Sequence, residues 1–207
     1  MNNALSLVII AVTCLVSIVA FNNARLLERL ILWPPAISRE HQYDRLVTYG
    51  LVHASAGHLF VNMFTLFFFS PLIEQVYAIF LGRLGFVVFY IGALIVSILP
   101  TFLANRDNPH YRSLGASGAV SAVVFAYVLL QPWTTIYLYF VPVPAIVYAV
   151  LYVFYSIYMD KRSSDNVNHS AHLWGAAFGV SFTLLMNPHL FSLFMAALTH
   201  PEYRLGH

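Results

Sequence analysis

The chain has 207 residues, of which 60% are apolar and 9% charged, and its formal net charge is +2. Soluble domains are roughly 45–50% apolar and about 25% charged, so this composition excludes an ordinary soluble domain, which would expose large apolar patches. The charge is small and forms no basic run, which argues against nucleic acid as a partner. Cys14 is the only cysteine, so an intrachain disulfide or a thiolate zinc site is excluded.

Apolar stretches with no charged residue in their interiors follow one another along the chain. Because a bilayer-crossing helix needs about 20 apolar residues, they predict spans at about 4–21, 58–74, 84–104, 115–130, 136–159 and 169–186. We therefore expect an all-α polytopic membrane protein, a six-helix bundle that forms one domain over residues 1–207.

The ends of two of these spans, and one shorter apolar segment, carry further information. The first lacks a basic n-region and is long for a signal peptide, so we expect a retained span. Pro142 and Pro144 predict that the fifth helix is kinked or starts late, because each proline removes a backbone donor. The segment 190–198 is too short to cross, and we expect it to lie along the interface or to prolong the last helix.

Polar clusters open the second, fourth and sixth spans, and polar groups in a bilayer are functional candidates because they are costly there. The clusters are His58-x-x-x-Asn62, Gly115-x-Ser117-Gly118 and His169-x-x-His172-x-x-Gly175-x-x-x-Gly179. Alternate spans enter the membrane from the same side. All three clusters are therefore expected at one depth on one side of the bundle.

Serine becomes a nucleophile when a base takes its proton, and histidine is the usual base near neutral pH. Ser117 and His172 are the candidate pair. Gly175 and Gly179 share a helix face with His172 and would let the sixth helix pack closely on the fourth. The sequence thus predicts a Ser117–His172 dyad.

An oxyanion formed during attack on a carbonyl needs hydrogen-bond donors. His58 and Asn62 lie at i and i+4 on one helix face and can supply two of them. The start of the fourth helix offers unpaired backbone N–H groups, and Gly115 and Gly118 allow another backbone to come close.

Each cluster also has a plainer explanation. Ser117 could be a helix cap or a packing residue, while His172, His58 and Asn62 could make interhelical hydrogen bonds. His169 and His172 could bind a metal, but the spans hold no carboxylate or thiolate to complete a site. We expect neither metal nor organic cofactor, and the common location of the three clusters favours the catalytic interpretation.

With these motifs in this order, from about Arg45 to Gly179, the chain resembles the rhomboid family of intramembrane serine proteases. The resemblance implies that Ser117 is the nucleophile and His172 the general base. It also implies that His58, Asn62 and the Ser117 backbone N–H line an oxyanion hole, and that Gly115 and Gly118 shape the active-site turn. It assigns structural roles to Arg45, in the loop after the first span, and to Glu74, at the end of the second.

The chain departs from the family pattern at two positions. The residue before the loop arginine, commonly aromatic, is Asp44. The position four residues after the nucleophile, often a tyrosine that stacks on the catalytic histidine, is Ser121. We therefore expect another side chain, Trp174 or His169, to orient the His172 imidazole.

The expected function is an intramembrane serine endopeptidase that cleaves membrane-protein substrates in or next to their transmembrane segments. The alternatives are a catalytically silent rhomboid-like protein that binds membrane clients, and a small transporter or channel with a polar path through His58, Asn62 and His172. The family pattern implies a bacterial inner-membrane protein with a cytoplasmic N-terminus. The arginine distribution favours the opposite orientation under the positive-inside rule.

Overall fold

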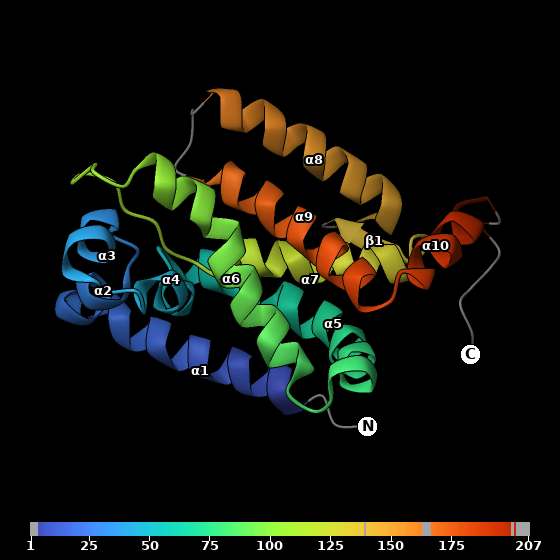
Figure 1. Ribbon diagram of the computed structural model, residues 1–207, viewed down its shortest axis with the longest axis horizontal. Coiled ribbons are helices and arrows are strands. Elements are labelled where there is room, and N and C mark those ends of the chain that lie inside the picture. Colours follow the sequence, from blue (N-terminus) through green and yellow to red (C-terminus); the bar gives the residue numbers. More distant parts are fainter. Residues whose placement is uncertain (1–3, 139, 163–166, 200, 202–207) are drawn as a thin grey trace.

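The structure is a computed structural model that describes residues 4–138, 140–162, 167–199 and 201, and it is predominantly helical (Figure 1). The elements in chain order are α1 (Ala4–Phe21), α2 (Ala24–Leu30), α3 (Pro34–Glu40), α4 (Arg45–Thr48), the 3-10 helix η1 (Tyr49–Leu51), α5 (Ala56–Leu81), α6 (Gly85–Ala104), α7 (Ser117–Leu130), β1 (Thr135–Leu138), β2 (Val141–Pro144), α8 (Ala145–Arg162), α9 (His169–Met186) and α10 (His189–Thr199).

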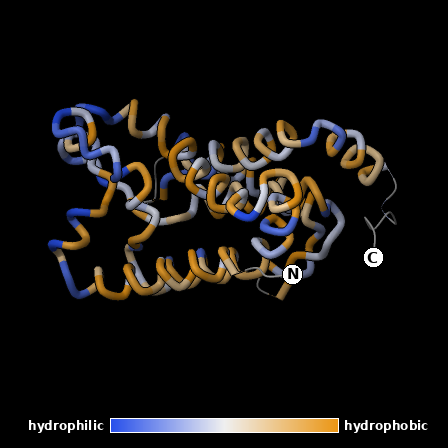
Figure 2. Tube along the Cα trace, turned by 60° about the horizontal axis from the view of Figure 1, so that its bottom comes forward, coloured by the Kyte–Doolittle hydropathy of each residue, from blue (hydrophilic) through white to orange (hydrophobic). Residues whose placement is uncertain are grey.

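The length and apolar composition of the helices identify an integral membrane protein. Among the described residues, α1, α5 and α6 are each long and apolar enough to cross a bilayer. The pair α9 and α10, bent by 114° at the break between them, makes a fourth candidate if it is one span. Figure 2 shows hydrophobic residues along α1 and hydrophilic ones gathered in the loop region that follows it.

The centre of the bundle is α7, whose side chains are buried at nearly every position. It packs against α5, α6 and α9. The contact with α9 is the closest, because Gly175 lies against the carbonyl of Gly118 and Gly179 lies against that of Ala122. A helix enclosed by protein on all sides can be short, and α7 has only 14 residues.

The helix predicted from residue 136 begins later than its apolar pattern suggests. The strands β1 and β2 pair in antiparallel fashion, with Thr135 opposite Pro144 and Leu138 opposite Val141. The helix α8 starts directly after Pro144. The prolines thus mark a late start, one of the two expected outcomes. The helical prediction is wrong for 136–138 and 140–144, because Pro142 and Pro144 have no N–H for a helical ladder, and at residue 139 it lies outside the described residues.

The expectation that no charge lies within a span is wrong at Glu74. The helix α5 continues through Pro71 to Leu81, so Glu74 lies inside it and is buried. Its two carboxylate oxygens accept hydrogen bonds from the backbone N–H groups of Leu5 and Ser6, at 3.0 and 2.9 Å. The positive end of the α1 dipole compensates the buried charge. Glu74 therefore has the expected structural role, but it ties the start of α1 to the interior of α5 and not to a helix end.

The loop between α1 and α5 is organised by Arg45, which is 5% exposed. Its guanidinium donates to the carbonyl oxygens of Glu28 and Ile31, at 2.8 and 2.6 Å, and so caps the end of α2. Asp44 accepts from Arg29 at 2.7 Å. That hydrogen bond from Arg29 lowers the pKa of the Asp44 carboxyl below its usual value. The structural role expected for Arg45 is confirmed.

Candidate active site

Ser117 is the first residue of α7, and the turn before it depends on glycine. Gly115 has a φ of +110°, a conformation that residues with a Cβ rarely adopt. A Cβ there would also lie 2.6 Å from Cε1 of His58. Gly115 therefore lets the backbone pass close to the His58 ring, so that α7 can begin with Ser117 at the cavity.

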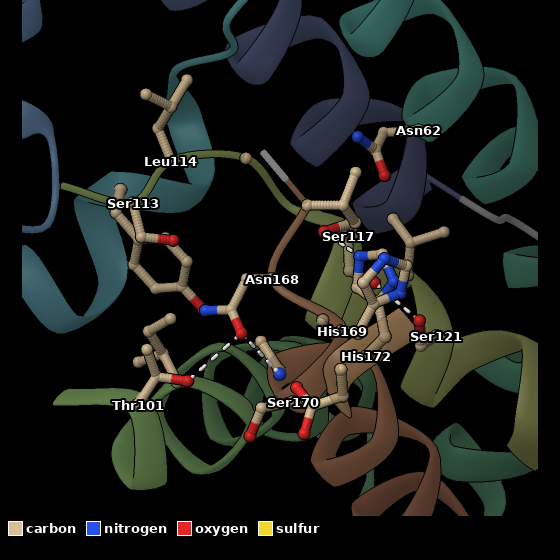
Figure 3. Close-up of a pocket in the computed structure, with 18 of the residues that line it drawn as sticks. Asn62, Thr101, Ser113, Leu114, Ser117, Ser121, Asn168, His169, Ser170 and His172 are labelled. Atoms are coloured by element: carbon tan, nitrogen blue, oxygen red, sulfur yellow. Dashed lines mark hydrogen bonds between the residues drawn. The ribbon is translucent and has the colours of Figure 1, made fainter. Parts of the chain in front are cut away.

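The side chains of Ser117 and His172 meet directly, with 2.8 Å between Ser117 Oγ and His172 Nε2 (Figure 3). Both residues are half-buried. They lie 55 positions apart in the sequence and come together because α7 and α9 pack with their backbones in contact. This is the distance that a serine nucleophile and its base require.

The start of α9, and with it His172, is held by Asn168. The Asn168 carboxamide oxygen caps the helix by accepting from the Ala171 N–H at 2.9 Å and also accepts from the Thr101 hydroxyl at 3.2 Å. Its amide nitrogen donates to the Tyr111 hydroxyl at 3.3 Å. One side chain thus joins α9 to the end of α6 and to the loop before α7; Figure 3 shows the hydrogen bond between Asn168 and Thr101.

His58 and Asn62 lie on the face of α5 that borders the same cavity as Ser117. Asn62 is 4% exposed, and its amide nitrogen donates to the His58 carbonyl at 3.0 Å. A carboxamide carries a second N–H, which can serve an oxyanion beside Ser117. The predicted site residues Ser117, His172, His58 and Asn62 therefore border a single cavity, although their catalytic roles remain predictions.

His53 also belongs to this site, and the sequence analysis missed it. Its Nε2 accepts the Ala116 N–H at 3.3 Å, so the proton must be on Nδ1, which donates to Ser17 Oγ at 2.9 Å. Burial is the main cause that lowers the pKa of His53 to about 3. A neutral His53 thus ties α1 to the residue before Ser117. The only feature of the sequence that could have pointed to His53 is its position five residues before His58.

The imidazole of His172 is flanked by an aromatic ring that was not predicted. Tyr152 of α8 stacks on it, with ring centroids 6.1 Å apart and planes 26° apart. The prediction for Trp174 is wrong, because its side chain is 49% exposed and lies two residues from His172, on the opposite helix face. His169 does touch His172, edge to face, with centroids at 5.7 Å.

A cavity of about 1220 Å³ lies over the dyad, bordered by helices α5, α6, α7, α8 and α9. Both polar and apolar side chains line it, so it can admit water together with an extended apolar chain. Within the described ranges, no three His, Cys, Asp or Glu side chains gather where a metal ion could be held. The chemistry that the arrangement supports is nucleophilic attack on a carbonyl by an activated serine.

Comparison with known proteins gives consistent matches. The sequence model of the Rhomboid domain matches residues 40–189. RHOMBOID-like protein 12, mitochondrial, of Arabidopsis thaliana is 34% identical over 144 residues, which are 64% of this chain and 43% of that protein. Putative rhomboid protease YdcA of Bacillus subtilis is 27% identical over 148 residues, 70% of this chain and 67% of that protein. Presenilin-associated rhomboid-like protein, mitochondrial, of Rattus norvegicus is 32% identical over 133 residues, 62% of this chain and 34% of that protein.

Proposed function

The chain belongs to the rhomboid family, and we propose that it is an intramembrane serine endopeptidase. Its substrates are membrane proteins cleaved in or next to their transmembrane segments. The observation that carries the proposal is the 2.8 Å contact between Ser117 Oγ and His172 Nε2 beside a cavity of about 1220 Å³. An interhelical hydrogen bond with a packing role alone would not need such a cavity.

In the proposed reaction, His172 Nε2 takes the proton of Ser117 Oγ as that oxygen attacks a peptide carbonyl carbon. The resulting oxyanion accepts hydrogen bonds from the Ser117 backbone N–H, one of the unpaired donors at the start of α7, and from the side chains of Asn62 and His58. His172 then gives its proton to the departing amine. Water enters through the cavity, His172 deprotonates it, and the hydroxide attacks the acyl-enzyme. The bond to Ser117 Oγ then breaks and the second product leaves, while His172 returns the proton to Ser117 Oγ.

We propose that six helices cross the membrane, namely α1, α5, α6, α7, α8 and α9. With its 14 residues, α7 is about 21 Å long at about 1.5 Å per residue, against a bilayer core of about 30 Å. Enclosure by the other helices allows α7 to be this short, because its ends need not reach the lipid surface. Its first residue, Ser117, would then lie below the membrane surface, reached by water through the cavity.

A substrate helix hides its carbonyl groups in its own hydrogen bonds and must unwind locally before Ser117 can attack. Glycine and other poor helix formers near the scissile bond reduce the cost of unwinding. We therefore propose a preference for transmembrane segments with small or helix-breaking residues at the cleavage site.

We also propose that the N-terminus faces the cytoplasm of a bacterium, with the protein in the inner membrane and the cavity opening outward. The many arginines on the cavity side argue against this orientation. Part of their charge is offset, since Arg29 pairs with Asp44 at 2.7 Å and Arg39 with Asp107 at 3.6 Å.

The test uses a fluorophosphonate probe, which reacts with activated serines, together with cleavage of a model transmembrane substrate in liposomes. The unmodified protein should be labelled at Ser117 and should cleave. Ser117→Ala should lose both activities, and His172→Ala should lose nearly all of both, while each variant keeps the unfolding midpoint of the parent. Full labelling or cleavage by either variant contradicts the proposal. Substrate retained by the parent protein without cleavage would instead support the client-binding alternative.

A further inference from the structure

The side chain of Tyr152 contacts His172 directly and is linked to the Ser117 backbone through Ser121. Its ring lies on the His172 imidazole, with centroids 6.1 Å apart and an interplanar angle of 26°. Its hydroxyl oxygen lies 2.6 Å from Ser121 Oγ, which donates to the Ser117 carbonyl oxygen at 2.8 Å. Tyr152 belongs to α8, whereas Ser117 and Ser121 belong to α7 and His172 to α9.

The direction of these hydrogen bonds follows from the number of protons. A serine hydroxyl has one proton, and that of Ser121 goes to the Ser117 carbonyl. The Tyr152 hydroxyl must then be the donor to Ser121 Oγ. Two hydrogen bonds in series therefore run from the Tyr152 hydroxyl to Ser121 Oγ and from the Ser121 hydroxyl to the backbone carbonyl of Ser117.

The size of residue 121 explains why the ring can come from α8. Ser121 is buried one helical turn after Ser117, and a small side chain at this position leaves room beside His172. Tyr152 fills that room from the neighbouring helix, and its hydroxyl donates a hydrogen bond to the buried Ser121 Oγ. The ring then lies beside the imidazole whose Nε2 faces Ser117 Oγ.

The helix that carries Tyr152 is the most exposed of those around the site. Buried residues of α8 are only Ala145, Ala149 and Ser156, and side chains such as Phe154 and Leu151 are 69% and 58% exposed. Figure 1 shows α8 at the edge of the bundle beside α9. The ring therefore reaches His172 only while α8 is docked.

We propose that Tyr152 is the positioning residue of the dyad: its ring orients the His172 imidazole toward Ser117, and its hydroxyl braces the Ser117 backbone through Ser121. The alignment of the dyad thereby depends on the docking of α8. This inference rests on the proposed protease function for its kinetic readout, and a structural readout tests it separately.

The experiment compares three variants in liposomes with a cleavable transmembrane substrate and with a fluorophosphonate probe. Tyr152→Leu removes the aromatic face, and Tyr152→Phe keeps the ring but removes the hydroxyl. Phe154→Leu is the matched control, an aromatic-to-leucine change on the exposed side of the same helix. Because misorientation of a base by a fraction of an ångström is costly, Tyr152→Leu should lower kcat and the labelling rate about tenfold, with KM changed less than twofold.

Tyr152→Phe should recover most of that loss, to within about threefold of the parent, because the ring contact with the imidazole is kept. Phe154→Leu should match the parent in every measurement. A Tyr152→Leu variant with the kcat and labelling rate of the parent overturns the inference. So does a loss of activity that is matched by an equal loss in Phe154→Leu, since the effect would then belong to α8 packing in general.

The structural readout is the NMR signal of the His172 ring in protein with labelled histidine, assigned by its absence in His172→Gln. The ring current of Tyr152 should shift this signal in the parent and in Tyr152→Phe but not in Tyr152→Leu. If Ser117→Ala still cleaves as the parent does, the proposed function fails, and the His172 signal alone then decides the inference. An identical signal in Tyr152→Leu and the parent overturns it.

Discussion

The backbone of Gly118 in α7 lies directly against the α-carbon of Gly175 in α9, so that a Cβ at Gly175 would collide with the Gly118 carbonyl. A side chain at Gly175 would therefore push the two helices apart, whereas a Cβ at Gly118 would collide with Ser97 of α6. His172 lies one turn before Gly175 on the same face of α9. The contact between two backbones is therefore what brings the imidazole within reach of Ser117.

Gly175→Ala should separate α7 and α9 and break the Ser117–His172 contact. Overpacking a close helix contact costs about 1–3 kcal/mol, so the unfolding midpoint should fall and probe labelling should nearly disappear. Gly57→Ala is the matched control, because its Cβ would come no closer than 3.9 Å to another side chain. Normal labelling of Gly175→Ala would show that the dyad does not depend on this contact.

Asn168→Ala should destabilise the start of α9, because the N–H of Ala171 and the Thr101 hydroxyl both lose their acceptor. Loss of an N-cap costs about 1–2 kcal/mol. Asn168→Asp keeps the capping oxygen and loses only the donor to Tyr111, so it should be nearer to the parent in unfolding midpoint and in labelling rate. Equal losses in the two variants would mean that the bond to Tyr111, rather than the cap, holds α9.

His53 should make the protein less stable in acid. Burial lowers its pKa from 6.5 in the unfolded chain to about 3 in the folded protein, so between these values the unfolded state binds more protons. Stability contributed by neutral His53 is then present above pH 6.5 and is lost as the pH falls toward 3, at up to about 1.4 kcal/mol per pH unit.

The measurement is the unfolding midpoint of the parent and of His53→Phe across this pH range. His53→Phe should be less stable at pH 7.5, because the Ala116 N–H loses its acceptor and Ser17 Oγ loses the hydrogen bond that His53 Nδ1 donates. Its midpoint should fall less steeply in acid. Parallel curves for the two proteins would argue against a neutral His53 in the folded state.

The orientation can be tested with single cysteines in a Cys14→Ser background. Asn108→Cys lies in the loop between α6 and α7, on the side of the cavity, and Arg83→Cys lies in the turn between α5 and α6, on the opposite side. With the N-terminus in the cytoplasm, a membrane-impermeant maleimide added to intact cells should label Asn108→Cys and spare Arg83→Cys. The reverse pattern would place the site on the cytoplasmic side, in agreement with the arginine distribution.

The sequence by itself determined the class of protein and the candidates for the site. The low content of charged residues and the long apolar stretches indicated a protein embedded in a lipid bilayer. The alternation of spans placed Ser117, His172 and the His58–Asn62 pair on one side of the bundle. Helical periodicity also placed Gly175 and Gly179 on the His172 face. These inferences were possible because each depends on neighbours within one helix or on the order of spans.

Only the tertiary structure decided which side chains from different helices meet. Nothing near Tyr152 in the sequence indicates that its ring covers His172, and nothing near His53 indicates its bond to Ala116. In the sequence, Glu74 suggested the end of a span, because a charge is costly in a bilayer. In the structure, the N-terminus of α1 compensates the charge of Glu74 inside α5. Such contacts depend on the rotation and crossing angle of helices far apart in the chain, which no local pattern encodes.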